Sequence, residues 1–237
     1  MEKLIYLLWK QPGQSQETWR AGMRGAVGGA LLDAGALSLQ FNLVDEDVAA
    51  GDGLRIVTRQ PPPDGLAIFW MQTANNRERC EDLLRRNHDR IAGYLVTESL
   101  ILDDRQRRPV GGRSHGFSLI GFLQRPPRLS ESEWLRIWLG SHTSVAVETQ
   151  DTFRYVQNVV ARVLTPDAPP LDALVEEGFP TAALDSPHAF YDAVGDEDRY
   201  RRHLDRMMTS CRRFIDFDRI DSLPTSEYVI GALPNPN

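Results

Sequence analysis

His142 is the residue of this sequence whose type and position best suit acid–base chemistry. It follows Trp134 and Trp138 in a stretch whose spacing predicts a helix. On a wheel of about 100° per residue, His142 falls roughly 80° from Trp134, at the edge of the apolar stripe. An imidazole there would line the mouth of an apolar pocket and exchange a proton near neutral pH. The alternative is a structural histidine, hydrogen-bonded at the helix end or frayed after Gly140.

Tyr155 and Asn158 stand on the next expected element, a strand over residues 154–164. Their odd spacing turns them to opposite faces of a regular strand, so only one can face the cleft beside His142. We expect Tyr155 to be the second catalytic candidate, as a hydrogen-bond donor to a ligand. Asn158 is a candidate ligand contact, although its counterpart at Asn42 favours a structural role.

The other candidates are contacts for an apolar ligand. Trp138 and Trp70 have no tryptophan counterpart in the repeat described below, which favours a pocket wall over core filling. Trp134 has a counterpart at Trp19, so core filling competes with ligand contact. Arg125 ends a strand, where a charge is usually solvated; its alternative role is to hold an anionic group of the ligand.

The chain contains an internal repeat. Residues 4–19, LIYLLWKQPGQSQETW, align with residues 119–134, LIGFLQRPPRLSESEW, 115 places later. Several positions of this alignment are identical, whereas roughly one identity would be expected by chance. The identical pairs are Leu4/Leu119, Ile5/Ile120, Leu8/Leu123, Pro12/Pro127, Ser15/Ser130 and Trp19/Trp134. The alignment continues with Asn42 on Asn158, the Pro-rich stretch 58–65 on 165–172, and Gly65 on Gly178.

Each half predicts elements in the order β-α-β-β-α-β. In the second half we expect strands at 118–124, 154–164 and 179–186, a helix opened by Ser130 and Glu133 as a capping box, two later helical segments, and a last strand within 215–230. This is the ferredoxin-like order, whose antiparallel sheet carries helices on one face only. The predicted fold is therefore α+β: two fused ferredoxin-like units whose antiparallel sheets pack as a pseudo-twofold α/β barrel.

The expected boundaries follow from the repeat. The first unit spans 1–105, a linker spans 106–115, the second unit spans 116–232, and 233–237 is a tail. The basic stretch RRPVGGRSHG at 107–116 is expected to be exposed.

Residues 121–158 resemble the EthD family of the dimeric α/β-barrel superfamily. The matching features are a strand that ends in Arg-Pro, a capped helix with Trp134 and Trp138, His142 after them, and Tyr155 early in the next strand. The resemblance covers most of 116–232 and, more weakly, 2–103. In the first half the histidine is missing, so a site that depends on it exists once per chain.

The resemblance implies a cleft in the second unit for a small apolar or aromatic molecule. Related barrels include cyclases, decarboxylases, dehydratases, monooxygenases and haem-degrading enzymes, so the fold does not decide the reaction. The implied chemistry is a cofactor-independent dehydration, decarboxylation, cyclisation or oxidation with His142 as acid and base. A non-catalytic ligand-binding protein, or an accessory protein of an oxygenase system, is the alternative, and enzyme activity stays open.

Composition restricts the partners and cofactors. The 33 acidic and 27 basic residues give a net charge of −6, which disfavours nucleic acid, and no apolar run approaches the ~20 residues of a membrane span. Cys80 and Cys211 lie far apart without zinc spacing, so we expect a cytoplasmic protein. No cofactor or metal motif is present; haem bound axially through His142 is the remaining alternative, and a homodimer is left open.

Overall fold

The structure is a computed structural model that describes residues 1–231, apart from the side chain of Arg105. Antiparallel strands form a closed barrel in the order β1-β3-β2-β8-β5-β7-β6-β4. The strands are β1 Glu2–Trp9, β2 Ser38–Leu43, β3 Gly65–Met71, β4 Arg90–Asp103, β5 Phe117–Leu123, β6 Arg154–Val163, β7 Ala173–Phe179 and β8 Asp221–Val229. The expected α+β class and antiparallel pairing are confirmed, whereas the tail at 233–237 lies outside the described residues.

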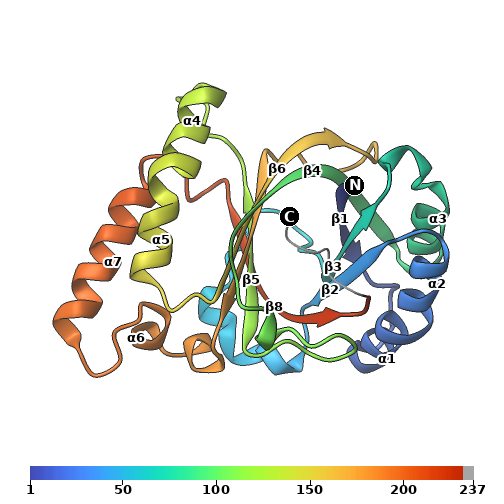
Figure 1. The fold of residues 1–237 in the computed structure, drawn as a ribbon, viewed down its shortest axis with the longest axis horizontal. Coiled ribbons are helices and arrows are strands. Elements are labelled where there is room, and N and C mark those ends of the chain that lie inside the picture. Colours follow the sequence, from blue (N-terminus) through green and yellow to red (C-terminus); the bar gives the residue numbers. More distant parts are fainter. Residues whose placement is uncertain (232–237) are drawn as a thin grey trace.

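Two groups of helices cover opposite sides of the barrel, α1 to α3 on one side and α4 to α7 on the other (Figure 1). Their bounds are α1 Gln16–Gly22, α2 Gly28–Asp33, α3 Glu78–Asn87, α4 Glu131–Ile137, α5 Thr143–Thr149, α6 Pro187–Phe190 and α7 Glu197–Cys211. A π-helical turn, Met23–Val27, joins α1 to α2, and a second one, Trp138–His142, joins α4 to α5. No helix of the described residues is both long and apolar enough to span a membrane.

The first helix of each group begins at a serine. Ser130 accepts a hydrogen bond from the backbone N–H of Glu133, and the Glu133 side chain accepts one from the backbone N–H of Ser130. The predicted capping box is thus confirmed. Ser15 caps α1 through the backbone N–H of Thr18, where no glutamate is available to return the bond.

The pairing registers of the two halves correspond. Leu4 pairs with Phe69, and its repeat counterpart Leu119 pairs with Glu177, so β3 and β7 occupy equivalent places. In this register Asn42 and Asn158 hold corresponding places, because they pair with Leu66 and Leu174, respectively. The alignment of Gly65 with Gly178 is wrong by several residues, since the register places Gly65 on Ala173.

Two expectations about the second half are also wrong. The third strand is Ala173–Phe179, and residues 181–184 form a 3-10 turn after Pro180. Two adjacent glutamates inside a buried strand concealed it. The stretch 107–116 is not simply exposed: Arg108 is 5% exposed and Ser114 6%, because both side chains reach an ionic network inside the barrel.

Alternate residues of each strand face the barrel interior, as the pleat requires. The interior is apolar toward the end where β1 and β5 finish, with Leu7 and Phe122 among its residues. The opposite end holds charged groups such as Lys3 and Glu176. The outer faces of the strands pack against the two helical groups, so the chain has two distinct kinds of compartment in which a ligand could lie.

Candidate functional site

Most of the predicted site residues lie in one layer, between the second half of the sheet and helices α4, α5 and α7. Trp134, Trp138 and Tyr155 belong to the same buried cluster, and the two indole rings lie 5.3 Å apart. His142 packs on Phe214 beside them, with ring centroids 4.6 Å apart. The structure therefore brings the two catalytic candidates into the same layer.

His142 is enclosed by that layer. It is 6% exposed, and its Nδ1 lies 2.9 Å from the Ser210 hydroxyl. Burial, together with the charge of Arg213, lowers the pKa of His142 to about 4, so the imidazole is neutral at pH 7. Its predicted acid–base role stays a prediction.

Glu177 is a further candidate residue that was not predicted from the sequence. It lies directly across from Tyr155, its partner in the β6–β7 register, and both side chains face the helices. No hydrogen bond or ion pair joins its carboxylate to any other residue in the described part of the chain. Burial raises the pKa of Glu177 to about 8, so the carboxyl is largely protonated at pH 7. A group of this kind can give or take a proton near neutral pH.

The surroundings of Tyr155 complete this arrangement. Burial and the nearby Glu177 charge raise the pKa of Tyr155 well above its ordinary value, while the neighbouring polar groups of Trp138 and Gln157 oppose that rise. The amide of Gln157 is itself held by a 2.8 Å bond to the Thr143 hydroxyl. The phenol is therefore a neutral donor set among fixed polar groups.

The equivalent positions of the first half are filled mainly by hydrophobic side chains. Leu39 faces Phe69 across the strands as Tyr155 faces Glu177, and both Leu39 and Phe69 are fully buried. At these positions the second half has mainly polar side chains and a glycine, where the first half has mainly packed apolar side chains. The counterparts are Leu39 and Tyr155, Phe41 and Gln157, Phe69 and Glu177, and Tyr6 and Gly121.

The backbones of the helices in the second half lie farther from the strands than those of the first half. Helix α2 approaches β2 and helix α3 approaches β4, whereas in the described chain α4, α5 and α7 make no comparable backbone approach to the strands (Figure 1). Several apolar side chains of the layer are only partly buried: Leu102, Leu135, Leu139, Val147, Val159, Tyr191, Cys211 and Ile215.

The remaining predicted contacts lie elsewhere. Asn158 and Trp70 face the barrel interior, where the Asn158 amide donates to Glu176 Oε1 at 3.0 Å and Trp70 joins the inner apolar cluster. Arg125 is half-buried at the end of β5, and its guanidinium donates to the Leu129 carbonyl. The structure does not bring these three residues together with Tyr155.

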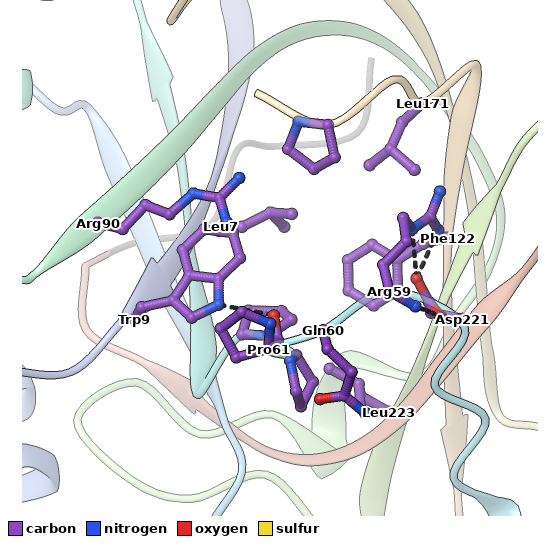
Figure 2. A pocket seen from close by; sticks show the side chains of 13 residues that line it. Leu7, Trp9, Arg59, Gln60, Pro61, Arg90, Phe122, Leu171, Asp221 and Leu223 are labelled. Atoms are coloured by element: carbon purple, nitrogen blue, oxygen red, sulfur yellow. Dashed lines mark hydrogen bonds and ion pairs between the residues drawn. The ribbon is translucent and has the colours of Figure 1, made fainter. Parts of the chain in front are cut away.

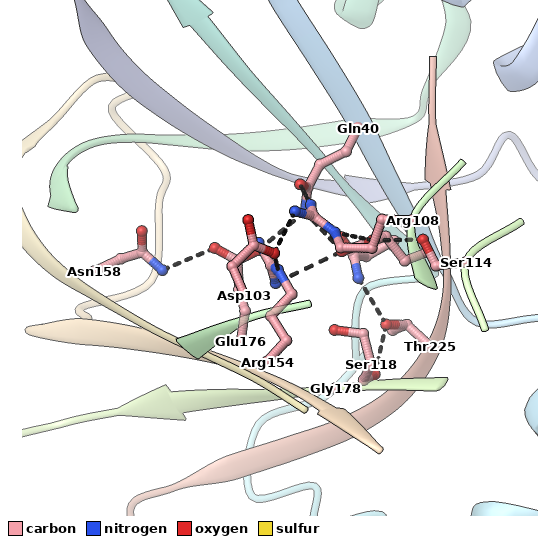
Figure 3. Close-up of polar contacts among 12 residues, drawn as sticks. Gln40, Asp103, Arg108, Ser114, Ser118, Arg154, Asn158, Glu176, Gly178 and Thr225 are labelled. Atoms are coloured by element: carbon pink, nitrogen blue, oxygen red, sulfur yellow. Dashed lines mark hydrogen bonds and ion pairs between the residues drawn. The ribbon is translucent and has the colours of Figure 1, made fainter. Parts of the chain in front are cut away.

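The charged end of the barrel interior is an ionic network that joins the two halves (Figure 3). Glu176 lies 2.7 Å from Lys3 Nζ and 2.9 Å from Arg154 Nη2, and Glu227 lies 2.7 Å from Arg108 Nε. Although burial opposes it, these cations hold the pKa of both glutamates below the usual range. Since the carboxylates are fully paired, the network serves structure.

A haem bound through His142 would need open space over the imidazole. The ring is only 6% exposed, packs on Phe214 and has its Nδ1 against the Ser210 hydroxyl, so the residues present do not fit a haem. Within residues 1–231, no group of three His, Cys, Asp or Glu side chains is placed to hold a metal ion.

Glu177 could have been found from the sequence VEEGF. In a strand, adjacent residues point to opposite faces, so Glu176 and Glu177 cannot both reach the same cations. One of the two carboxyls must lie on the helix-covered face. The third strand of the second half was expected at 179–186, beyond both glutamates, so neither side chain was assigned to a face of the sheet.

Comparisons with known proteins show the fold alone. No protein-family model matches the chain, and neither does any curated protein. An anthrone oxidase-like protein is similar in structure, with a TM-score of 0.53 and 10% identity over 97% of this chain and 91% of that one. A proposed monooxygenase from Fusobacterium nucleatum has a TM-score of 0.50 and 9% identity over 97% and 91% of the two chains. A mutant chlorite dismutase from Candidatus Nitrospira defluvii has a TM-score of 0.50 and 8% identity over 95% and 90%.

Proposed function

We propose that the protein binds a small aromatic molecule between the second half of its sheet and helices α4, α5 and α7, and transfers a proton there. Glu177 is the proton-transfer group, Tyr155 donates a hydrogen bond to the ligand, and Trp134 and Trp138 contact its rings. The observation that carries the proposal is a carboxyl without a partner, directly opposite a buried phenol. Buried groups with shifted pKa values are typical of catalytic sites.

His142 is the second candidate for the proton-transfer group. Its pKa of about 4 differs from the value of about 8 for Glu177, so a pH profile separates the two. A reaction that needs the Glu177 carboxylate gains rate between pH 6 and 9. A reaction that needs neutral His142 as the base is already at its plateau in this range.

We also infer that the chain is a fusion of two EthD-like units, 1–105 and 116–232, joined by residues 106–115. The matching strand registers of the halves support this history, as do the two π-helical turns at repeat-equivalent places. Within the chain β2 pairs with β8 and β4 with β6, so barrel closure needs no second copy. The homodimer stays a prediction, to be checked by light scattering.

Anthrone is a suitable probe of the proposed reaction, and one structural neighbour is an anthrone oxidase-like protein. Loss of a ring-methylene proton from anthrone gives an aromatic enolate. Dioxygen then oxidises the enolate to anthraquinone, with water as the other product. The protein's part in this sequence is to hold the rings, take the proton at Glu177 and exclude bulk water.

The test is anthrone consumption under air from pH 6 to 9. We expect Glu177→Gln to lower kcat by about 100-fold or more, the usual size of a general-base contribution. Glu177→Phe restores the residue type of the first half and should abolish binding. Glu131→Gln, on an exposed turn of α4, is the control and should match the wild type.

Two other outcomes have definite meanings. Saturable binding of anthrone without turnover would favour the alternative, a non-catalytic carrier or an accessory protein of an oxygenase. Turnover that Glu177→Gln leaves intact would contradict the proposed role of Glu177.

A further inference from the structure

A pocket opens at one end of the barrel, on its inner face (Figure 2). Its volume is about 240 Å³, and its apolar walls include Leu7, Phe122, Leu171 and Leu223. These walls come from both halves of the chain. The two Pro-rich stretches that repeat in the sequence, 58–65 and 165–172, both contribute to its lining.

Arg59 brings a charged group to this pocket. Its Nε lies 2.6 Å from Asp221 Oδ2, and Asp221 also accepts hydrogen bonds from the backbone and hydroxyl of Thr58. The aspartate is therefore well satisfied. By contrast, Arg59 Nη1 is buried and has no hydrogen-bond partner among the described residues, so one donor of this lining residue is unused.

Arg90 adds a second positive charge on the other side of the pocket. Its guanidinium stacks over the Trp9 ring at 4.3 Å, and its Nη2 donates to the Asp167 carbonyl at 3.1 Å. The Trp9 indole is in turn fixed by a 3.0 Å bond to the Pro61 carbonyl. Among the described residues, no carboxylate forms an ion pair with Arg90.

We propose that this pocket binds a small aromatic carboxylate. A cavity of about 150 Å³ holds benzene, so the volume of about 240 Å³ accommodates one substituted ring. The charged lining residues are Arg59, Arg90 and Asp221, which leaves a net positive charge once Asp221 is paired. Proline, tryptophan and phenylalanine surfaces receive the ring, and one of the two guanidinium groups receives the carboxylate.

This site is separate from the proton-transfer site proposed above. The pocket lies inside the barrel, whereas Tyr155 and Glu177 face the helices outside it. The two proposals can therefore fail independently.

Benzoate and its neutral counterpart benzyl alcohol are the probes, measured by isothermal titration calorimetry. We expect benzoate to bind at least about tenfold more tightly, since hydrogen bonds to charged groups are stronger than those between neutral groups. The double variant Arg59→Gln/Arg90→Gln should lose that preference and bind both probes alike. Leu171→Trp, which fills the pocket, should abolish binding of both.

Arg136→Gln removes the same charge from the exposed face of α4 and should leave both affinities unchanged. If the double variant fails to fold, Arg90→Gln alone should still weaken benzoate binding by a few fold, because Arg90 has no part in the Asp221 contacts. The proposal is overturned if benzoate does not bind to the wild type. It is overturned equally if benzoate and benzyl alcohol bind alike, or if Leu171→Trp leaves benzoate binding intact.

Discussion

Tyr155 on β6 and Glu177 on β7 are direct cross-strand neighbours whose side chains share the helix-covered face of the sheet. Leu39 and Phe69 hold the same relationship in the first half. One half of the chain therefore uses these positions for packing, and the other half uses them for a phenol and a carboxyl. A polar pair costs stability at a buried place, which makes a function for the second half the simplest explanation.

The cost of placing the Glu177 carboxyl in this layer makes the stability of the folded protein depend on pH. The folded state binds the Glu177 proton more tightly than the unfolded chain does, because its pKa rises from 4.5 to about 8. Its contribution to stability is therefore full below pH 4.5 and is lost as the pH rises toward 8. We expect Glu177→Gln to remove this loss, so that urea denaturation shows an advantage of the variant that grows from pH 4.5 to about 8. An equal pH dependence in both proteins would contradict the buried carboxyl.

The lowered pKa of His142 makes the stability of the folded protein depend on pH in the opposite direction. Its pKa falls from 6.5 in the unfolded chain to about 4 in the folded protein, so its contribution is full above pH 6.5 and is lost as the pH falls toward 4. At ~1.4 kcal/mol per pKa unit, the loss is about 3 kcal/mol at most. Thermal melts of wild type and His142→Gln between pH 4 and 7 should converge at the acid end, and parallel curves would refute this account.

The ionic network inside the barrel predicts a large effect of a single charge. Glu176→Gln leaves Lys3 and Arg154 without their shared carboxylate, and breaking a buried pair costs about 3–5 kcal/mol. Glu148→Gln breaks an exposed pair with Arg206 and should cost about 1 kcal/mol or less. Chemical denaturation measures both, and similar costs for the two variants would exclude a buried network.

The internal repeat allowed the fold to be predicted because its identical residues are buried or cap helices. Trp19 and Trp134 are both buried, and Ser15 and Ser130 both cap helices. These positions tolerate few residue types, so the similarity of the halves survives in them. The α+β class, the antiparallel sheet and the start of α4 could therefore be predicted from the sequence.

The predictions from the sequence were wrong where charged residues lie in buried strands. Glu176 and Glu177 concealed β7, and Arg108 was taken for a linker residue, although its partners at Gln40 and Glu227 lie far away in sequence. Long-range partners of this kind decide burial and cannot be found from local pattern. For the same reason Tyr155 was identified without Glu177, its neighbour across the strands.

The capping box gives a further test of how far local sequence controls stability. Ser130→Ala removes the cap of α4 and should cost about 1 kcal/mol, whereas Thr209→Ala, exposed on α7, should cost almost nothing. Urea denaturation compares the two variants. Equal costs would mean that tertiary packing alone sets the start of α4.

The most direct measurement of the central proposal is a ¹³C NMR titration of the Glu177 carboxyl, assigned by comparison with Glu177→Gln. We expect a pKa near 8 in the free protein, and a clear change of the resonance when 2-naphthol is added as an aromatic probe. A titration near the ordinary value of 4.5, with no response to 2-naphthol, would contradict a proton-transfer site between the sheet and helices of the second half.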